Sequence, residues 1–230
     1  MSESFAQRLA EVRKEIDRAA LAADRSPETV KLLAVSKTFP AAAVLEAYHA
    51  GARSFGESRI QELEEKKAAL PADIEWHFIG HLQSNKAAKA VELADWIHSV
   101  DSLKLLNKLD RVAGELGRKP VILLEVNSGE ETKSGVDYAA LPELAEAAAQ
   151  ARNLDWRGLM TMAPLSSDPA VWRQAFTRLA GTRDELERRL RVTLPELSMG
   201  MSGDFPVAVA AGATVVRIGT ALFGGRDYTH

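Results

Sequence analysis

One lysine stands where a strand is expected to leave its sheet. Lys37 lies near the end of the apolar run LLAVSKT (residues 32–38), and such a run usually ends where the chain leaves the sheet. Two turns punctuated by glycine come far downstream, SMGMSGD (residues 198–204) and RIGTALFGG (residues 217–225). An amine combined with two turns suited to holding phosphate suggests a bound aldehyde phosphate.

The chemistry expected of Lys37 depends on its protonation state. An amine condenses with an aldehyde only when it is unprotonated, and a model lysine, with a pKa of about 10.4, is almost fully charged at neutral pH. Burial at the mouth of a barrel disfavours the ammonium form. The alternative is an ion-paired lysine or one that extends to solvent, and the two glycine turns favour the functional interpretation.

The first turn offers an anion site or an ordinary helix cap. Ser202 and Gly203 precede a helix expected at 205–211, so their amides and the serine hydroxyl can point at an anion. Asp204 can instead simply cap that helix. The loops after the last two strands of a parallel barrel commonly bind phosphate, and Gly219 and Thr220 lie on the second of these loops.

Arg217 lies within a predicted strand. Along a strand it faces the opposite way from Val216 and Ile218, which points it into the barrel. A buried arginine needs a partner, and that partner is a carboxylate, a phosphate or a pyridine nitrogen. At a pyridine nitrogen the arginine would keep the ring unprotonated and weaken it as an electron sink.

The histidines do not predict a metal site. His77 and His81, in HFIGH, have a spacing that suits zinc on a helix, but Gly80 and the strand pattern IEWHF oppose that geometry. We expect His81 to line the rim near a cofactor, while His49 and His98 are interpreted as ordinary helix and strand-end residues.

The polar loop NSGEETKSG (residues 127–135) follows the most apolar strand, VILLEV. Such a loop is usually a surface connection. The alternative is a lid or exchange surface in which Lys133 forms a second contact with an aldehyde.

Short apolar runs alternate with helical stretches from Thr29 onward, which predicts a parallel sheet. The number of strands, about eight, is the number that closes a (β/α)8 TIM barrel. An extra amphipathic helix is expected at about 3–24, before a barrel at about 29–228, all within one domain, 1–230. An open doubly wound sheet has the same alternation, but its glycine fingerprint is missing after the first strand. The predicted strands are 30–36, 54–55, 74–79, 96–100, 121–126, 156–160, 196–198 and 214–218, and the predicted helices are 41–50, 58–70, 84–92, 103–116, 141–151, 169–190 and 205–211.

Composition excludes several classes of partner. The 230 residues carry 29 basic and 32 acidic side chains, a net charge of -3, which favours neither nucleic acid nor an anionic membrane. The chain has no cysteine, which suits a reducing compartment, and no long apolar segment that would act as a signal or membrane span. We expect a cytoplasmic protein, and the lack of an exposed apolar stripe predicts a monomer.

Several blocks taken together carry a resemblance to a known family. LLAVSKT, FGESRIQE, WHFIGHLQSNK, VNSGEETKSG, GLMTMAP, LSMGMSGD and VVRIGTALFG resemble the pyridoxal phosphate homeostasis proteins, whose fold is similar to the N-terminal barrel domain of alanine racemase. The resemblance implies that Lys37 carries pyridoxal 5'-phosphate as a Schiff base. It also implies that Arg217 approaches the pyridine ring, that Met199 lies by the cofactor, and that the phosphate is held by Ser202, Gly203, Gly219 and Thr220.

The resemblance has one local departure. The family pattern FGEN reads FGES in this chain, so Ser58 replaces an asparagine. Any contact made by the longer asparagine side chain would need a water molecule as a bridge.

The expected function is storage, protection or delivery of the cofactor, without catalytic residues and without a metal. Racemases of this fold use a second base, a tyrosine delivered with a second β-domain, and we expect no such domain because the sequence ends at His230, soon after the last strand. Transient contacts with apoenzymes that need the cofactor fit this role. The alternatives are an amino-acid racemase or transaminase-like enzyme of low activity and a Schiff-base aldolase acting on a sugar phosphate.

Overall fold

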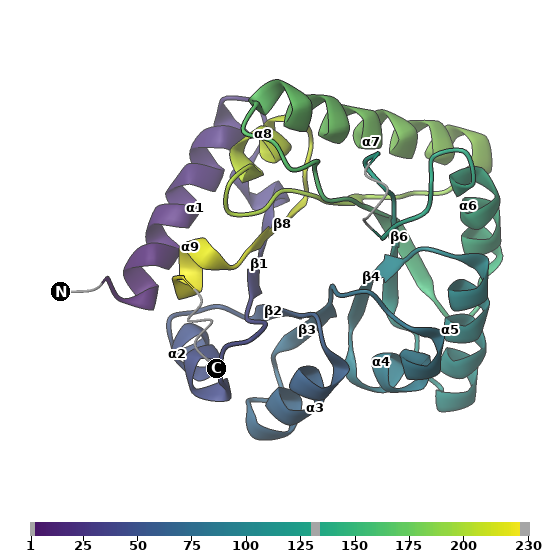
Figure 1. Cartoon of the computed structure of the whole chain (residues 1–230), viewed down its shortest axis with the longest axis horizontal. Coiled ribbons are helices and arrows are strands. Elements are labelled where there is room, and N and C mark those ends of the chain that lie inside the picture. Colours follow the sequence, from purple (N-terminus) through teal and green to yellow (C-terminus); the bar gives the residue numbers. More distant parts are fainter. Residues whose placement is uncertain (1–2, 130–133, 226–230) are drawn as a thin grey trace.

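Eight parallel strands close into a barrel in the order of the chain, from β1 to β8 (Figure 1). This arrangement is a computed structural model that describes residues 3–129 and 134–225. The predicted TIM barrel is therefore confirmed. The strands are β1 (Lys31–Val35), β2 (Ser54–Glu57), β3 (Glu75–Phe78), β4 (Trp96–Val100), β5 (Val121–Glu125), β6 (Asp155–Met160), β7 (Glu196–Ser198) and β8 (Val215–Ile218).

Helices surround the barrel and follow the strands in alternation (Figure 1). Their buried positions recur every three or four residues, as expected of helices with one apolar stripe against a sheet. They are α1 (Phe5–Leu21), α2 (Ala41–His49), α3 (Ile60–Ala69), α4 (Ala87–Leu93), α5 (Leu103–Leu116), α6 (Leu141–Gln150), α7 (Pro169–Leu190), α8 (Phe205–Ala210) and α9 (Thr220–Phe223), with 3-10 turns η1 (Pro27–Thr29) and η2 (Ser84–Lys86).

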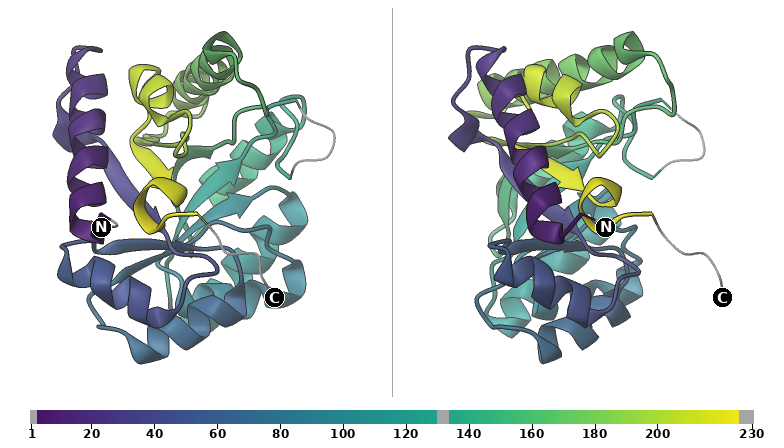
Figure 2. Two further views of the ribbon diagram at one scale, coloured as in Figure 1. Left: turned by 60° about the vertical axis from the view of Figure 1, so that its left-hand side comes forward. Right: turned by 90° about the vertical axis from the view of Figure 1, so that its left-hand side faces the viewer.

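The extra helix α1 begins at a capping box. The Ser4 hydroxyl accepts from the Gln7 amide, and the Gln7 side chain accepts from the Ser4 amide at 2.8 Å. Phe5, Leu9 and Ile16 are among its buried residues. Figure 2 shows α1 in purple on the outside of the barrel, beside the yellow α8 and α9. The predicted N-terminal helix is thus present and covers the junction of β1 and β8.

The inside of the barrel is unusually polar. TIM barrels are generally filled by branched apolar residues, and Leu123 and Met160 form part of such a layer. Three side chains with polar heads nevertheless lie fully or almost fully buried on β3, β4 and β8, namely His77, His98 and Arg217. Buried polar groups of this kind require hydrogen-bond partners.

No helix in the described part of the chain is both long enough and apolar enough to span a bilayer.

Candidate functional site

Lys37 lies at the C-terminal rim of the barrel, as predicted. Strand β1 ends at Val35, and its last residues pair with Gly56 of β2 and with Ile218 of β8. The Lys37 side chain is half-buried. The lysine therefore follows the end of β1, between the ends of β2 and β8, at the face where catalytic and binding groups of this fold collect.

The residue before Lys37, Ser36, is hydrogen-bonded to side chains of β2 and α3. The Ser36 hydroxyl donates to Glu57 Oε1 at 2.6 Å, and Lys66 Nζ donates to the Ser36 carbonyl oxygen at 2.9 Å. Lys66 also donates to Glu57 Oε1 at 2.6 Å. Because these groups come from β2 and α3, they fix the backbone immediately before Lys37.

The residue after Lys37 is anchored in the same direction. The Thr38 amide donates to Glu62 Oε2 at 2.7 Å, and Thr38 has a φ of 72°, a left-handed conformation that costs a threonine free energy. Ser36 and Thr38, the two neighbours of Lys37, are thus hydrogen-bonded to side chains of α3 and β2. These bonds restrict the directions that the lysine side chain can take.

Glu57 and Lys66 form a buried ion pair. Glu57 is 0% exposed and Lys66 5%. Burial raises the pKa of Glu57, and this effect is opposed by hydrogen bonds from Lys66 and Ser36. The pair was not predicted, although Lys66 continues the buried stripe of Ile60 and Leu63 on α3. A lysine at such a position signals a buried partner.

The two glycine turns meet at the rim. The Ser202 hydroxyl, after β7, accepts from the Ala221 amide, after β8, at 3.3 Å. A Cβ on Gly219 would lie 3.4 Å from the Val35 carbonyl oxygen, so this turn runs close beside β1. Gly200 has a φ of 95°, and a Cβ there would lie 2.6 Å from that of Ala208. The first turn therefore requires glycine at position 200.

Each turn leads into a short helix. Asp204 takes the N-cap position of α8, while its carboxylate accepts a hydrogen bond from the Met201 amide within the turn. Gly219 takes the N-cap position of α9, which begins at Thr220. Helix α8 was predicted but α9 was not, because four residues are too few to show helical periodicity.

Arg217 is buried, as its position between two apolar strand residues predicted. Its Nη1 donates to the Ser198 carbonyl at 2.8 Å and to the Ser198 hydroxyl at 2.7 Å, and its Nη2 donates to the Thr161 carbonyl at 2.8 Å. Within the described residues, none of these partners is a carboxylate. Burial lowers the pKa of Arg217 to about 10, with Glu125 and Asp204 opposing the shift. The guanidinium therefore stays charged at neutral pH.

The remaining predicted residues differ in their surroundings. Met199 is 0% exposed and belongs to the main hydrophobic cluster, so its contact with a cofactor stays a prediction. Gly203 and Thr220 are exposed. Lys37, Ser202, Gly203 and Gly219 lie in the loops that follow β1, β7 and β8, Thr220 is the first residue of α9, and Arg217 lies within β8 itself.

The FGES and IGH segments pack directly against each other. A Cβ on Gly80 would lie 2.2 Å from the Ser58 carbonyl oxygen, so the glycine is required by the backbone of residue 58. His81 is exposed, with its Nδ1 3.6 Å from Asp101 Oδ2. Lys133, the suggested second aldehyde contact, lies outside the described residues. In the described ranges no cluster of three or more histidine, aspartate or glutamate side chains could hold a metal.

The interpretation of His98 as an ordinary strand-end residue is wrong. His98 lies within β4, is 0% exposed and has hydrogen-bond partners at both ring nitrogens, in His77 and Ser198. A histidine within the apolar strand WIHSV faces a buried environment on either side of the sheet. This pattern was the available signal.

The family described as the N-terminal domain of alanine racemase matches residues 8–227. The chain is 49% identical to a pyridoxal phosphate homeostasis protein of Pseudomonas aeruginosa, over 98% of this chain and 97% of that one. It is also 46% identical to PipY of Synechococcus elongatus, whose structure was solved with pyridoxal phosphate (PLP) bound. That match has a TM-score of 0.82 and covers 96% of this chain and 100% of PipY.

A more distant similarity concerns the fold alone. An alanine racemase of Clostridium difficile is 15% identical, with a TM-score of 0.74, over 98% of this chain and 58% of the racemase.

Proposed function

The chain belongs to the alanine racemase N-terminal domain family, and within it to the pyridoxal phosphate homeostasis proteins, and on that premise we propose that it binds pyridoxal 5'-phosphate at the C-terminal rim of its barrel. When bound, this cofactor supplies an aldehyde that condenses with a primary amine and a phosphate dianion that binds backbone amides. The observation that carries the proposal is that Lys37 follows the end of β1, that β1 pairs with β8, and that the two glycine turns after β7 and β8 are joined by a hydrogen bond.

Lys37 is the residue that we propose to hold the aldehyde as a Schiff base. Its half-buried side chain leaves the barrel wall between residues that are tied to β2 and α3. This anchoring reduces the conformational entropy that the lysine backbone would lose on binding. The lysine thus starts from a geometry suited to forming one covalent bond.

The phosphate is proposed to lie on the amides of Ser202, Gly203, Gly219 and Thr220, with the Ser202 hydroxyl as a further donor. The hydrogen bond between Ser202 and Ala221 supports this assignment, because it holds both turns on one side of the opening. Among the described residues, no atom beyond its chain neighbours lies within 4 Å of a Cβ built on Gly203, so this side of the residue is open.

Arg217 is proposed to face the pyridine nitrogen, and Met199 to lie beside the ring. Three hydrogen bonds to uncharged oxygen atoms hold the guanidinium in place. A charged donor in that position stabilises the unprotonated nitrogen and so weakens the ring as an electron sink. This effect favours holding the cofactor over using it.

We propose that the protein is a carrier rather than a racemase. A racemase needs a second base opposite the lysine. The Tyr48 hydroxyl donates to the Asp73 carboxylate on the outside of the barrel at 2.8 Å, and the Tyr138 ring packs under the guanidinium of Arg178 at 3.6 Å. These two tyrosines have other contacts, and Tyr228 lies outside the described residues.

Absorbance with pyridoxal phosphate tests the proposal. We expect a visible Schiff-base band in the wild-type protein that is absent from the variant Lys37→Ala. The control variant Lys67→Ala should retain the band, because in the wild type the Lys67 ammonium donates to the Leu93 carbonyl outside the barrel. A colourless protein that cleaves sugar phosphates would contradict the proposal. The carrier role is tested with L- and D-amino acids, and enzyme-like rates of racemisation would refute it.

A monomer acting in the cytoplasm, with transient contacts to apoenzymes, completes the proposal. The most exposed large apolar residues, Leu165, Leu21 and Leu116, lie in a loop, on α1 and on α5, and such scattered residues form no continuous patch. Light scattering after gel filtration is expected to give the mass of one chain, 25.0 kDa.

A further inference from the structure

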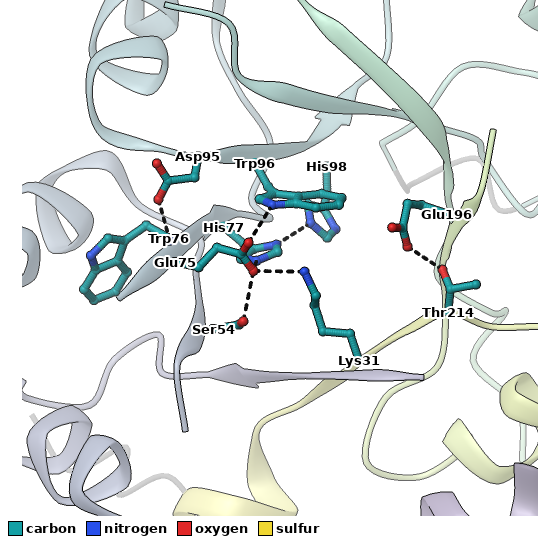
Figure 3. A network of polar contacts seen from close by, with 10 residues as sticks. All are labelled: Lys31, Ser54, Glu75, Trp76, His77, Asp95, Trp96, His98, Glu196 and Thr214. Carbon is teal, nitrogen blue, oxygen red and sulfur yellow. Dashed lines mark hydrogen bonds and ion pairs between the residues drawn. The ribbon is translucent and has the colours of Figure 1, made fainter. Parts of the chain in front are cut away.

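A chain of polar side chains crosses the inside of the barrel and ends at Arg217. Figure 3 shows its outer part, where Lys31, Ser54 and Glu75 meet at the N-terminal ends of β1, β2 and β3, with His77 and His98 behind them. Residues at this end of a TIM barrel usually serve stability. These hydrogen-bonded side chains instead lead from that end of the barrel to a residue of the proposed cofactor site.

Glu75 accepts four side-chain hydrogen bonds at the outer end of this hydrogen-bonded chain. Its Oε1 accepts from Lys31 Nζ at 3.0 Å, from the Ser54 hydroxyl at 2.9 Å and from His77 Nε2 at 2.8 Å, and its Oε2 accepts from Trp96 Nε1 at 3.2 Å. The bond with His77 is the largest cause that holds the pKa of Glu75 well below its usual range. Glu75 is therefore ionised, and His77 must carry its proton on Nε2.

The two histidines then have only one consistent pair of tautomers. Burial lowers the pKa of His77 and lowers that of His98 further, so both rings are neutral. With its proton on Nε2, His77 can only accept at Nδ1, which lies 2.9 Å from His98 Nε2. His98 therefore donates from Nε2 and accepts at Nδ1.

Ser198 connects the histidines to Arg217. His98 Nδ1 lies 2.9 Å from the Ser198 hydroxyl oxygen, and Arg217 Nη1 donates to that same oxygen at 2.7 Å. The hydroxyl proton therefore points to His98. Strands β4 and β7 are not neighbours in the barrel, so the bond between His98 and Ser198 crosses the interior.

We propose that Glu75, His77, His98 and Ser198 are positioning residues for Arg217, forming one directed chain of hydrogen bonds that holds its guanidinium at the pyridine ring. This inference rests on the proposed function, because it assigns Arg217 to the cofactor. Every bond in the chain points from the cation at Arg217 to the anion at Glu75. Aligned bonds of this kind polarise and strengthen one another in a medium of low dielectric constant.

The direction of the chain can be tested in the protein without cofactor. Long-range nitrogen–proton NMR is expected to show His77 and His98 as neutral rings protonated at Nε2. The charged groups that influence these rings are Lys31, Glu75, Asp95 and Arg217. A spectrum in which His98 carries its proton on Nδ1, or in which His77 is doubly protonated at neutral pH, would overturn the proposal whether or not the cofactor binds.

Variants test the connection to the cofactor. Ser198→Ala cuts the chain beside Arg217, and Glu75→Gln removes the anion at its far end. We expect both to shift the absorbance band of the bound cofactor, and Ser198→Ala to raise its Kd about tenfold. The control variant is Glu196→Gln. The Glu196 carboxylate lies at the same end of the barrel and accepts a hydrogen bond from the Thr214 hydroxyl at 2.7 Å. We expect this variant to leave the absorbance band and the Kd unchanged.

The outcomes separate the two proposals. A wild-type protein that forms no Schiff base refutes the proposed function, whereas the histidine tautomers still test the chain. If the wild type binds and Glu75→Gln and Ser198→Ala, folded by circular dichroism, keep its absorbance band and Kd, the chain has no positioning role. Should either variant fail to fold, the tautomers in the wild-type protein decide.

Discussion

Replacing Lys66 by methionine tests how the structure holds Lys37 in place. Methionine is about as long as the lysine stem and is apolar, so Lys66→Met mainly removes the ammonium from the buried Glu57 carboxylate, 2.6 Å away. Removing one member of a buried ion pair typically costs about 3 to 5 kcal/mol. We expect the free energy of unfolding to fall by about 3 kcal/mol at pH 8, the lower end of that range, because Ser36 still donates to Glu57.

The loss is expected to shrink in acid. Burial already raises the pKa of Glu57, and Lys66 counteracts this shift, so the variant raises the pKa further. A carboxyl whose pKa is higher in the folded protein favours folding fully below its unfolded pKa, about 4.3. That contribution is lost as the pH rises through the folded pKa. The variant therefore approaches the wild type in stability toward pH 5.

Urea unfolding at pH 5 and pH 8 measures both effects. The control is Lys67→Met on the same helix, which loses one hydrogen bond to the Leu93 carbonyl and is expected to cost about 1 kcal/mol at both pH values. The double variant Lys66→Met with Glu57→Gln is expected to be more stable at pH 8 than Lys66→Met alone. Equal losses for Lys66→Met and Lys67→Met, without pH dependence, would refute the reasoning.

Four further variants separate binding from stability. Gly80→Ala places a Cβ 2.2 Å from the Ser58 carbonyl oxygen and should lower the melting temperature. Gly181→Ala lies within α7, where a Cβ would meet no described atom within 4 Å outside the helix's own backbone, and should raise stability by up to about 1 kcal/mol. Equal melting temperatures for the two variants would contradict this. Ser202→Ala should raise the Kd for pyridoxal phosphate about tenfold and cost about 1 kcal/mol or less in urea. Arg217→Gln should weaken retention of the cofactor during dialysis more than it lowers the stability of the fold. If the variants of Ser202 and Arg217 both keep their affinity for the cofactor but melt at a lower temperature, both residues are structural.

The sequence was sufficient to predict the barrel and the rim. Most of the strands carry a short apolar run followed by a helical stretch, and this alternation predicts a parallel sheet of about eight strands, although β2 (SFGE) and β7 (ELS) show the pattern weakly. The position of Lys37 followed from the end of its apolar run, and the burial of Arg217 from strand alternation, which is a local property of the backbone.

The hydrogen-bonded chain inside the barrel could not be predicted in the same way. Its two outer members look unremarkable in their own strands, since Glu75 begins β3 and Ser198 ends β7. Their chemistry arises only when closure of the sheet brings β3, β4, β7 and β8 around one axis. The same is true of the Glu57 and Lys66 pair, in which a strand and the following helix each supply one buried charge.

Mass mapping after borohydride reduction shows whether Lys37 carries the cofactor. The purified protein is loaded with pyridoxal phosphate, reduced to make the Schiff base permanent, digested and analysed peptide by peptide. We predict the reduced adduct on Lys37. An adduct found on Lys133 or on surface lysines, with Lys37 unmodified, would contradict the account.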